Sequence, residues 1–173
     1  MALRILYKGS PVLESLSKTV EIGLDTFELV DKLKEAIRFK DKVWTLTGLS
    51  ICAVQIGIPL RVVIIGRPLY WNCQRHHQAF DVLINPELTF KSQEILEEWE
   101  GCLSLPDIEC LVPRHSEVRI KYQDLSGKTQ QKLMKKTLSR VIQHEIDHLN
   151  GKFMTELAKD SRPKMNHLEH KDT

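Results

Sequence analysis

The sequence lacks the features that would place the protein in a membrane or on a nucleic acid. No apolar run approaches the ~20 residues that span a bilayer. The formal net charge is only +2, and no run of lysine or arginine is interleaved with aromatic residues. The first eight residues, from Met1 to Lys8, are too mixed in polarity to form a secretory signal. We therefore expect a cytoplasmic protein, in a bacterium or in the host of a virus, with an organelle as the alternative, and no membrane or nucleic-acid partner.

Cysteine is scarce, and its spacing is irregular. The four cysteines, at positions 52, 73, 102 and 110, do not follow the close, regular spacing of a disulfide framework. In a reducing compartment a cysteine is either a small apolar residue or a metal ligand. The 173 residues, 42% of them apolar and 28% charged, suffice for one well-packed domain, which we expect to be a monomer. We assign this domain to residues 1–158 and expect residues 159–173 to form a polar, disordered tail.

Hydrophobic periodicity predicts a helix near each end of the chain and short strands between them. The helical spacing runs from Thr26 to Phe39 and again from Thr137 to Leu149. Strands are expected at residues 61–65, 81–86, 94–99 and 118–122, and a turn at residues 124–127 leads to a strand that ends near Met134. Residues 1–25 and 67–80 lack a regular pattern. The order predicts an α+β fold in which mostly antiparallel short sheets pack around a central C-terminal helix, with one N-terminal covering helix.

The segment Gln143–His148 carries the strongest chemical pattern in the chain. His144 and His148 are four residues apart, so on a helix both imidazoles lie on one face and can bind one metal ion. Glu145 directly follows the first histidine, which is the place of a general base beside a metal site. The alternative interpretation is a solvated, charged helix turn, since the pattern also arises by chance.

A metal site of the catalytic type needs a third protein ligand. Cys102 is the best candidate because Gly101 permits a sharp turn beside it and a thiolate suits a borderline or soft metal. The other cysteines and several acids stay open as alternatives. A metallopeptidase that uses the same helical unit would instead take a histidine or glutamate downstream of the helix, and the residues available there are Glu156, His167, Glu169 and His170.

Other polar residues have two interpretations each. The cluster Cys73-x-x-His76-His77 resembles part of a metal site, but a solvated loop is favoured because no further ligand lies at zinc-module spacing. Asp147 either orients a ligating histidine or faces solvent. Glu100 either pairs with Arg114 to brace the segment around Cys102 or forms a lone surface pair.

Three motifs together resemble those of the peptide deformylase family, the metal hydrolases that remove the formyl group from the N-terminal methionine of new proteins. The segment Gly48-Leu-Ser-Ile-Cys-Ala-Val-Gln55 is similar to the family pattern Gly-x-Gly-x-Ala-Ala-x-Gln. Glu100-Gly-Cys-Leu-Ser104 and Gln143-His-Glu-Ile-Asp-His148 match the other two patterns completely. The resemblance covers about residues 4 to 157, which would then form the catalytic domain. A deformylase-like protein that binds metal without turnover is a further alternative, although Glu145 and Gln55 are both present.

The resemblance implies a role for each matching residue. Cys102, His144 and His148 would bind the metal, with water in the fourth position, and Glu145 would act as general base and then as general acid. The side chain of Gln55 and the backbone N–H of Leu103 would stabilise the oxyanion. Ferrous iron is the metal implied in the cell, with zinc, nickel or cobalt as replacements, because the ligand set Cys-His-His admits all of them.

Substrate contacts are also implied, and two departures from the family patterns bear on them. The substrate would be the formyl-methionine N-terminus of a nascent peptide, held like an added strand by the segment of Gly48 and Ser50, with Gly101 as a further contact and Val141 in the wall of the methionine pocket. Ser50 and Cys52 stand where the family has glycine and alanine, so Ser50 is expected to narrow the cleft. Many bacterial members dock on the ribosome through a long C-terminal helix, which the short polar tail does not suggest here.

Overall fold

A computed structural model describes residues 4–38, 50–66 and 80–164. The elements in chain order are a 3₁₀ turn at Pro11–Glu14, α1 (Leu24–Arg38), β1 (Ser50–Cys52), a second 3₁₀ turn at Ala53–Ile56, β2 (Val62–Gly66), β3 (Phe80–Lys91), β4 (Ile95–Cys102), β5 (Leu105–His115), β6 (Glu117–Gln123), β7 (Thr129–Lys135), α2 (Lys136–Leu149), α3 (Met154–Leu157) and β8 (Asp160–Pro163). These elements confirm the predicted α+β class.

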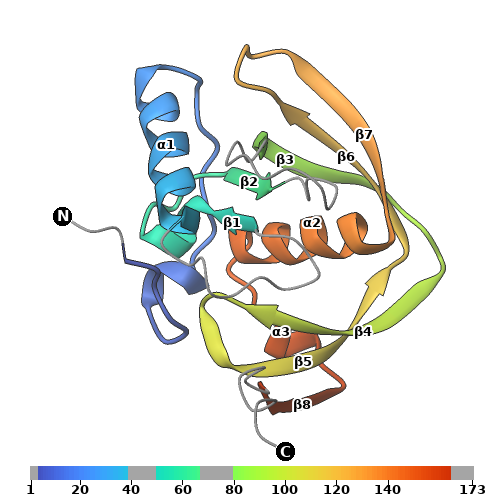
Figure 1. Cartoon of the computed structure of the whole chain (residues 1–173). Coiled ribbons are helices and arrows are strands. Elements are labelled where there is room, and N and C mark those ends of the chain that lie inside the picture. Colours follow the sequence, from blue (N-terminus) through green and yellow to red (C-terminus); the bar gives the residue numbers. More distant parts are fainter. Residues whose placement is uncertain (1–3, 39–49, 67–79, 165–173) are drawn as a thin grey trace, which may run out of the picture.

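The strands form two antiparallel sheets. Five strands pair in the order β1-β2-β3-β6-β7, and three pair in the order β4-β5-β8. Figure 1 shows α2 between them, with β4 and β5 on one side and β1, β2, β6 and β7 on the other. Because α2 packs against elements of both sheets, it is buried over almost its whole circumference. The central position predicted for the C-terminal helix is therefore confirmed.

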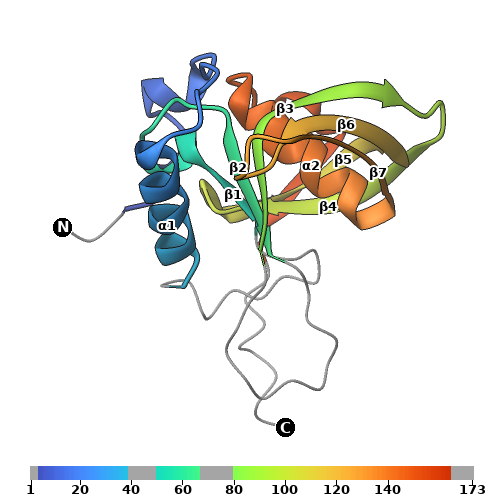
Figure 2. The same ribbon diagram turned by 90° about the horizontal axis from the view of Figure 1, so that it is seen from above.

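The strand β2 separates two apolar clusters, because successive side chains of a strand point to opposite faces. Val63 and Ile65 join the cluster around α2, whereas Val62 and Ile64 join the cluster around α1. The α1 cluster takes its helical side chains from one stripe of α1, namely Leu29, Val30, Leu33, Ala36 and Ile37. Figure 2 shows α1 apart from α2, with β1 and β2 between the two helices. The N-terminal helix thus covers the outer face of β1 and β2, as predicted.

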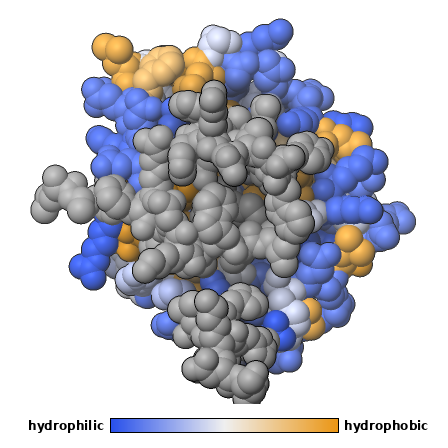
Figure 3. All heavy atoms as spheres, viewed as in Figure 1, coloured by the Kyte–Doolittle hydropathy of each residue, from blue (hydrophilic) through white to orange (hydrophobic). Residues whose placement is uncertain are grey.

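The surface of the described residues is mostly polar on the face seen in Figure 3, where apolar side chains gather in small separate groups between hydrophilic ones. The large apolar side chains that are exposed come from well-separated parts of the sequence, among them Leu16, Leu24, Phe90 and Leu133. None of the helices in the described ranges is long and apolar enough to cross a membrane.

Element boundaries differ from the sequence predictions in β3 and β5. The predicted strand at residues 81–86 is the first part of β3, which continues to Lys91. No strand was predicted for β5, whose sequence contains Pro106 and Pro113. Proline is tolerated at Pro113 because β8 pairs with β5 only over Ile108–Leu111, so Pro113 has no second neighbouring strand.

The prediction that residues 159–173 form a disordered tail is wrong for part of that range. Asp160–Pro163 form β8, which pairs with β5. The guanidinium of Arg162 lies 3.9 Å from the centre of the Trp99 ring, and its Nη2 lies 3.0 Å from the Glu109 carboxylate. These partners, supplied by β4 and β5, explain why a polar segment becomes a strand. Residues 165–173 lie outside the described residues, and the assignment of residues 1–158 to one domain stays a prediction.

The end of α2 depends on a glycine. Gly151 follows the C-cap residue Asn150 with φ of 71°, a left-handed conformation that favours glycine. A Cβ atom at Gly151 would lie 2.5 Å from the carbonyl oxygen of Glu14. Gly127, in the turn between β6 and β7, has φ of 81°, but its nearest contact would be 3.9 Å away.

We expect Gly151→Ala to destabilise the fold more than Gly127→Ala. Both substitutions force an alanine into the left-handed region, which costs about 1–2 kcal/mol. Only Gly151→Ala adds a collision with backbone, for which overpacking suggests a further cost of about 1–3 kcal/mol. Urea unfolding of the two variants measures the difference. Equal losses in the two variants would contradict the close approach of Gly151 to Glu14.

Candidate metal centre

The helix α2 brings His144 and His148 to one face, one turn apart. Their rings meet edge to face with centroids 4.8 Å apart. Both side chains are nearly inaccessible, with 9% of His144 and 1% of His148 exposed. A buried pair of imidazoles needs hydrogen-bond partners or a metal ion. The alternative interpretation of this segment as a solvated helix turn is therefore wrong.

The strand β4 faces α2 with matching periodicity. Glu100 and Cys102 are buried and Gly101 between them is exposed, as expected for alternate residues of a strand. Two residues of a strand advance by roughly 6.7 Å, and four residues of a helix advance by about 6 Å. The two inward residues of β4 can therefore contact both histidines of α2. Glu100 contacts His144, and Cys102 contacts His148.

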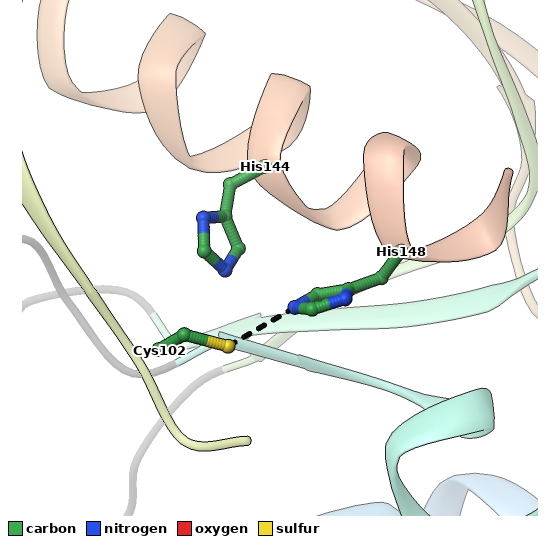
Figure 4. A group of neighbouring side chains, drawn as sticks. All are labelled: Cys102, His144 and His148. Carbon is green, nitrogen blue, oxygen red and sulfur yellow. Dashed lines mark hydrogen bonds between the residues drawn. The ribbon is translucent and has the colours of Figure 1, made fainter. Parts of the chain in front are cut away.

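Cys102 completes a group of three donors with the two histidines. The ligand atoms of Cys102, His144 and His148 all lie within 4.8 Å of one another. The Cys102 Sγ lies 3.1 Å from the His148 Nε2, and Figure 4 shows the three side chains converging from β4 and α2. Metal–sulfur and metal–nitrogen bonds of about 2.0–2.3 Å place tetrahedral ligand atoms roughly 3.5 Å apart. The donor set thus fits one divalent ion, and it contains the upstream cysteine.

The ring of His144 is oriented by Glu100. The His144 Nδ1–H donates to the Glu100 Oε2 at 3.0 Å, which leaves Nε2 free to face the other donors. Burial opposes a charge on His144, but the hydrogen bonds with Cys102 and Glu100 outweigh it and raise the pKa of this imidazole well above its ordinary value. Metal binding at Nε2 therefore displaces a proton.

Glu100 is held by two buried arginines as well. Arg114 donates to both of its carboxylate oxygens, at 2.9 and 3.0 Å, and Arg140 donates to Oε1 at 2.6 Å. Burial alone would raise the pKa of Glu100, but the hydrogen bonds from His144 and Arg114 lower it to about 2. The predicted pair of Glu100 and Arg114 is therefore a buried ion pair that braces the segment around Cys102. Arg140 was missed, because nothing in the sequence distinguishes it from an exposed helix residue.

The two arginines also connect α2 to β4 and β5. Arg114 of β5 forms an ion pair with Asp147 of α2. Arg140 of α2 donates to the carbonyl oxygens of Leu96 at 2.6 Å and Val112 at 2.8 Å. Asp147 thus neither contacts a ligating histidine nor lies free in solvent, the two interpretations that the sequence allowed.

His148 has a different environment from His144. Burial and the neighbouring charges of His144 and Arg114 lower the pKa of His148 well below its ordinary value, so the ring is neutral, as a metal ligand must be. Its ring packs edge to face against Phe153, with centroids 5.3 Å apart. Within the described part of the chain, the His148 Nδ1 is a buried atom without a hydrogen-bond partner.

Glu145 points away from the histidine face toward β1. Its Oε1 accepts a hydrogen bond from the Ser50 hydroxyl at 2.7 Å. Its Oε2 is buried and has no partner among the described residues. Burial raises the pKa of Glu145, although the neighbouring His144 and the hydrogen bond from Ser50 oppose this effect. A carboxylate with one buried, unpartnered oxygen is suited to accept a proton.

The amide of Gln55 is fixed at both ends. Its Oε1 accepts from the backbone N–H of Cys52 at 3.0 Å and from the Cys52 thiol at 3.4 Å. Its Nε2 then donates to the Ser104 hydroxyl at 3.2 Å and lies 3.9 Å from the Cys102 Sγ. The donor end of the amide therefore faces the metal donors. Ser104 also donates its backbone N–H to the Cys102 Sγ, at 3.4 Å, and its role was not predicted.

The remaining predicted residues lie around this group. Leu103 follows Cys102 in the turn between β4 and β5, and Gly101 precedes it on the exposed side of β4. Val141 is buried in the cluster around α2, one turn before Glu145. Gly48 and the cluster of Cys73, His76 and His77 lie outside the described residues, as do three of the downstream metallopeptidase candidates.

The fourth downstream candidate, Glu156, is not among the three metal donors. Its Oε1 accepts the backbone N–H of Phe153 at 2.8 Å and thereby caps α3. The donor set is instead completed by Cys102, which is upstream of the helix. The arrangement that a metallopeptidase of this type would need is therefore not formed by Glu156.

Comparison with known proteins identifies relatives over nearly the whole chain. The family model described as polypeptide deformylase matches residues 2–164. The chain is 35% identical over 154 residues to the peptide deformylase of Rickettsia prowazekii, covering 88% of this chain and 81% of the relative. It is 37% identical over 150 residues to peptide deformylase 1 of Nitrosomonas europaea, covering 85% of this chain and 82% of the relative.

Solved structures of similar chains share the fold. A probable peptide deformylase from Synechococcus phage S-SSM7 superimposes with a TM-score of 0.79 and 31% identity, covering 90% of this chain and 99% of the other. A class I type b peptide deformylase from Acinetobacter baumannii, solved with Met-Ala-Ser bound, superimposes with a TM-score of 0.77 and 28% identity, covering 91% of this chain and 98% of the other.

We expect Cys102→Ser to lose metal, because a hydroxyl is a far poorer ligand than a thiolate. Removal of a group that merely supports a ligand costs about 10–100-fold in metal affinity, so loss of the ligand itself should cost at least about 100-fold. Metal analysis after dialysis against a chelator measures this loss. Cys110→Ala is the matched control, since Cys110 is equally buried but is not in the donor group. Full metal content in Cys102→Ser would exclude Cys102 as a ligand.

We expect Glu100→Gln to weaken both the fold and the metal site. Two buried guanidinium groups would lose their shared anion, which costs about 3–5 kcal/mol of unfolding free energy. Metal affinity should fall about 10–100-fold, because the ring of His144 would lose its charged partner. Urea unfolding of the metal-free protein and chelator competition measure the two effects.

Glu98→Gln is the control for this substitution. Glu98 also pairs with Arg140, but 51% of its side chain is exposed, so its loss should cost within about 1 kcal/mol. If Glu100→Gln behaved like Glu98→Gln, the buried ion cluster would not support the metal site.

Proposed function

The chain belongs to the polypeptide deformylase family and is a metal-dependent hydrolase with peptide deformylase activity, and from this premise we propose its substrate and the part that each residue of the site takes. The proposed substrate is the formyl-methionine N-terminus of a nascent polypeptide, from which formate is released. A relative solved with Met-Ala-Ser bound supports a peptide that begins with methionine. The observation that carries the assignment of roles is the unpartnered buried oxygen of Glu145, next in sequence to a ligand of the three-donor group.

Cys102, His144 and His148 are proposed to hold one divalent metal ion. When bound, such an ion supplies a Lewis acid that lowers the pKa of a water molecule toward neutrality. We propose ferrous iron in the cell, with zinc, nickel or cobalt as functional replacements, because one thiolate and two imidazoles suit each of these ions.

Glu145 is proposed to act first as the general base and then as the general acid. Burial raises its pKa, so the carboxylate takes a proton from attacking water more readily than an exposed glutamate would. The same proton is then delivered to the departing amine of methionine, which would otherwise be a poor leaving group. Because α2 fixes Glu145 next to His144 and both side chains are buried, the proton would move over a short distance away from bulk solvent.

Gln55 and Leu103 are proposed to stabilise the negative charge that develops on the formyl oxygen. The Cys52 backbone fixes the Gln55 carbonyl, which directs the Nε2 donor toward the side of Cys102. Leu103 offers a backbone N–H directly after Cys102. Donors that are already oriented stabilise an oxyanion without reorganising during the reaction.

The substrate backbone is proposed to lie along the edge strand β1, which has one partner, β2, in the described sheet. A peptide added at this edge would form backbone hydrogen bonds with β1 on the side away from β2. Gly48, Ser50 and Gly101 are the proposed contacts with the backbone, and Val141 is proposed as part of the wall that receives the methionine side chain. A cytoplasmic location and a monomeric state complete the proposal. Ribosome docking through a C-terminal helix is not part of it.

We expect Glu145→Gln to abolish most of the turnover while the metal is retained. Loss of a general acid–base group lowers the rate by about 10²–10⁴-fold. Formate release from a formyl-Met-Ala-Ser peptide measures turnover, and metal analysis of the same sample measures retention. Glu117→Gln is the control, since the Glu117 carboxylate pairs with Lys135 at the end of β6 and β7, outside the three-donor group. A wild-type protein that holds metal but releases no formate would overturn the proposed function.

A further inference from the structure

The inner face of β1 carries two polar side chains where the family motif has glycine and alanine. Ser50 and Cys52 are alternate residues of one strand, so both point to the same side of the sheet. Cys52 lies in the cluster around α2, whereas Ile51 between them lies in the cluster around α1. The two departures of this chain from the motif therefore both face α2, the helix that carries Glu145.

The Ser50 hydroxyl makes a short contact with one oxygen of Glu145. It donates to Oε1 at 2.7 Å, across 95 residues of sequence. The second oxygen, Oε2, is buried without a partner among the described residues. The two carboxylate oxygens of Glu145 therefore have different environments. Oε1 is held by a hydrogen bond, and Oε2 can accept a proton.

A carboxylate at the end of a glutamate side chain needs such a contact to keep its orientation. The last torsion of glutamate is broad and roughly two-fold, so it does not by itself fix which oxygen faces the reacting atoms. A hydrogen bond to a charged group contributes about 1.5–3 kcal/mol, which is enough to favour one orientation. A glycine at position 50, as in the family motif, has no side chain to provide it.

We propose that Ser50 is a positioning residue for deformylation, whose hydroxyl holds Oε1 of Glu145 so that Oε2 is directed at the reacting atoms. This inference rests on the proposed role of Glu145 as the general base and general acid. The Ser50 side chain acts through Glu145 and does not itself touch the substrate.

The direction of the Ser50 side chain also decides whether it obstructs the binding of a peptide at the edge of β1. The sequence suggested that Ser50 narrows the cleft. Side chains of a strand stand roughly perpendicular to the sheet, whereas an added strand pairs within its plane. The hydroxyl of Ser50 is directed at α2, so it does not occupy the backbone edge of β1. A change at Ser50 should accordingly alter turnover more than peptide binding.

The test compares side chains that differ in the hydroxyl alone. Ser50→Thr keeps a hydroxyl, and Ser50→Val replaces it by a methyl group of nearly the same shape. Both residues are favoured in strands, so both variants should fold. Formate release from a formyl-Met-Ala-Ser peptide gives kcat and KM, and metal analysis of each sample confirms equal loading.

We expect kcat of Ser50→Val to fall about 10-fold, which corresponds to loss of about 1.4 kcal/mol of transition-state stabilisation. Its KM should stay within about two-fold, and Ser50→Thr should recover kcat to within about three-fold of the wild type, as expected for an interaction used in turnover. Ser50→Gly should resemble Ser50→Val. Ser116→Ala, which removes a buried serine hydroxyl that hydrogen-bonds with Ser92, should leave kcat unchanged.

Three results would overturn the inference, namely equal kcat for Ser50→Val and wild type, equal kcat for Ser50→Thr and Ser50→Val, or an effect confined to KM. Each of them presupposes an active wild-type enzyme. Absence of formate release by the metal-loaded wild type would instead contradict the proposed function, so the two failures are distinguished by the wild-type assay.

Discussion

The buried carboxylate of Glu100 is the contact on which the rest of the site depends. One anion on β4 is shared by the imidazole of His144 and by the guanidinium groups of Arg114 and Arg140. Hydrogen bonds to a charged group contribute more than neutral ones, and removal of one partner leaves the others buried without compensation. The same charge therefore orients a metal ligand and connects α2 to the hairpin of β4 and β5. Glu100 therefore supports both the packing of α2 and the geometry of the metal site.

The metal centre also depends on a match between two kinds of secondary structure. Alternate residues of β4 present Glu100 and Cys102, while residues four apart in α2 present His144 and His148, with nearly the same spacing. A strand and a helix laid side by side can thus provide ligands together with their support. The two histidines are fixed by the regular backbone hydrogen bonding of α2, and Cys102 lies at the end of β4, where the pairing with β5 shifts its register after Gly101.

Local patterns in the sequence were sufficient to predict the class, the central helix and the three donors. The motif residues Cys102, His144 and His148 are recognisable because each lies in a short segment whose neighbours are also characteristic. Elements that depend on distant partners were not predictable. The strand β8 forms because β5 is there to pair with it, and Arg140 becomes buried because Glu100 receives it. The contact of Ser50 with Glu145 depends on the distance between β1 and α2, which no local pattern encodes.

The division of β1 and β2 between two apolar clusters has a mechanical consequence. Ile51, Val62 and Ile64 pack in the cluster around α1, and their neighbours Cys52, Val63 and Ile65 pack in the cluster around α2. The packing of α1 against β1 and β2 therefore helps to set the distance between β1, which carries Ser50, and α2, which carries Glu145. A change in the size of the apolar side chains on α1 would therefore shift β1 and, through the hydrogen bond from Ser50, alter the orientation of the Glu145 carboxylate.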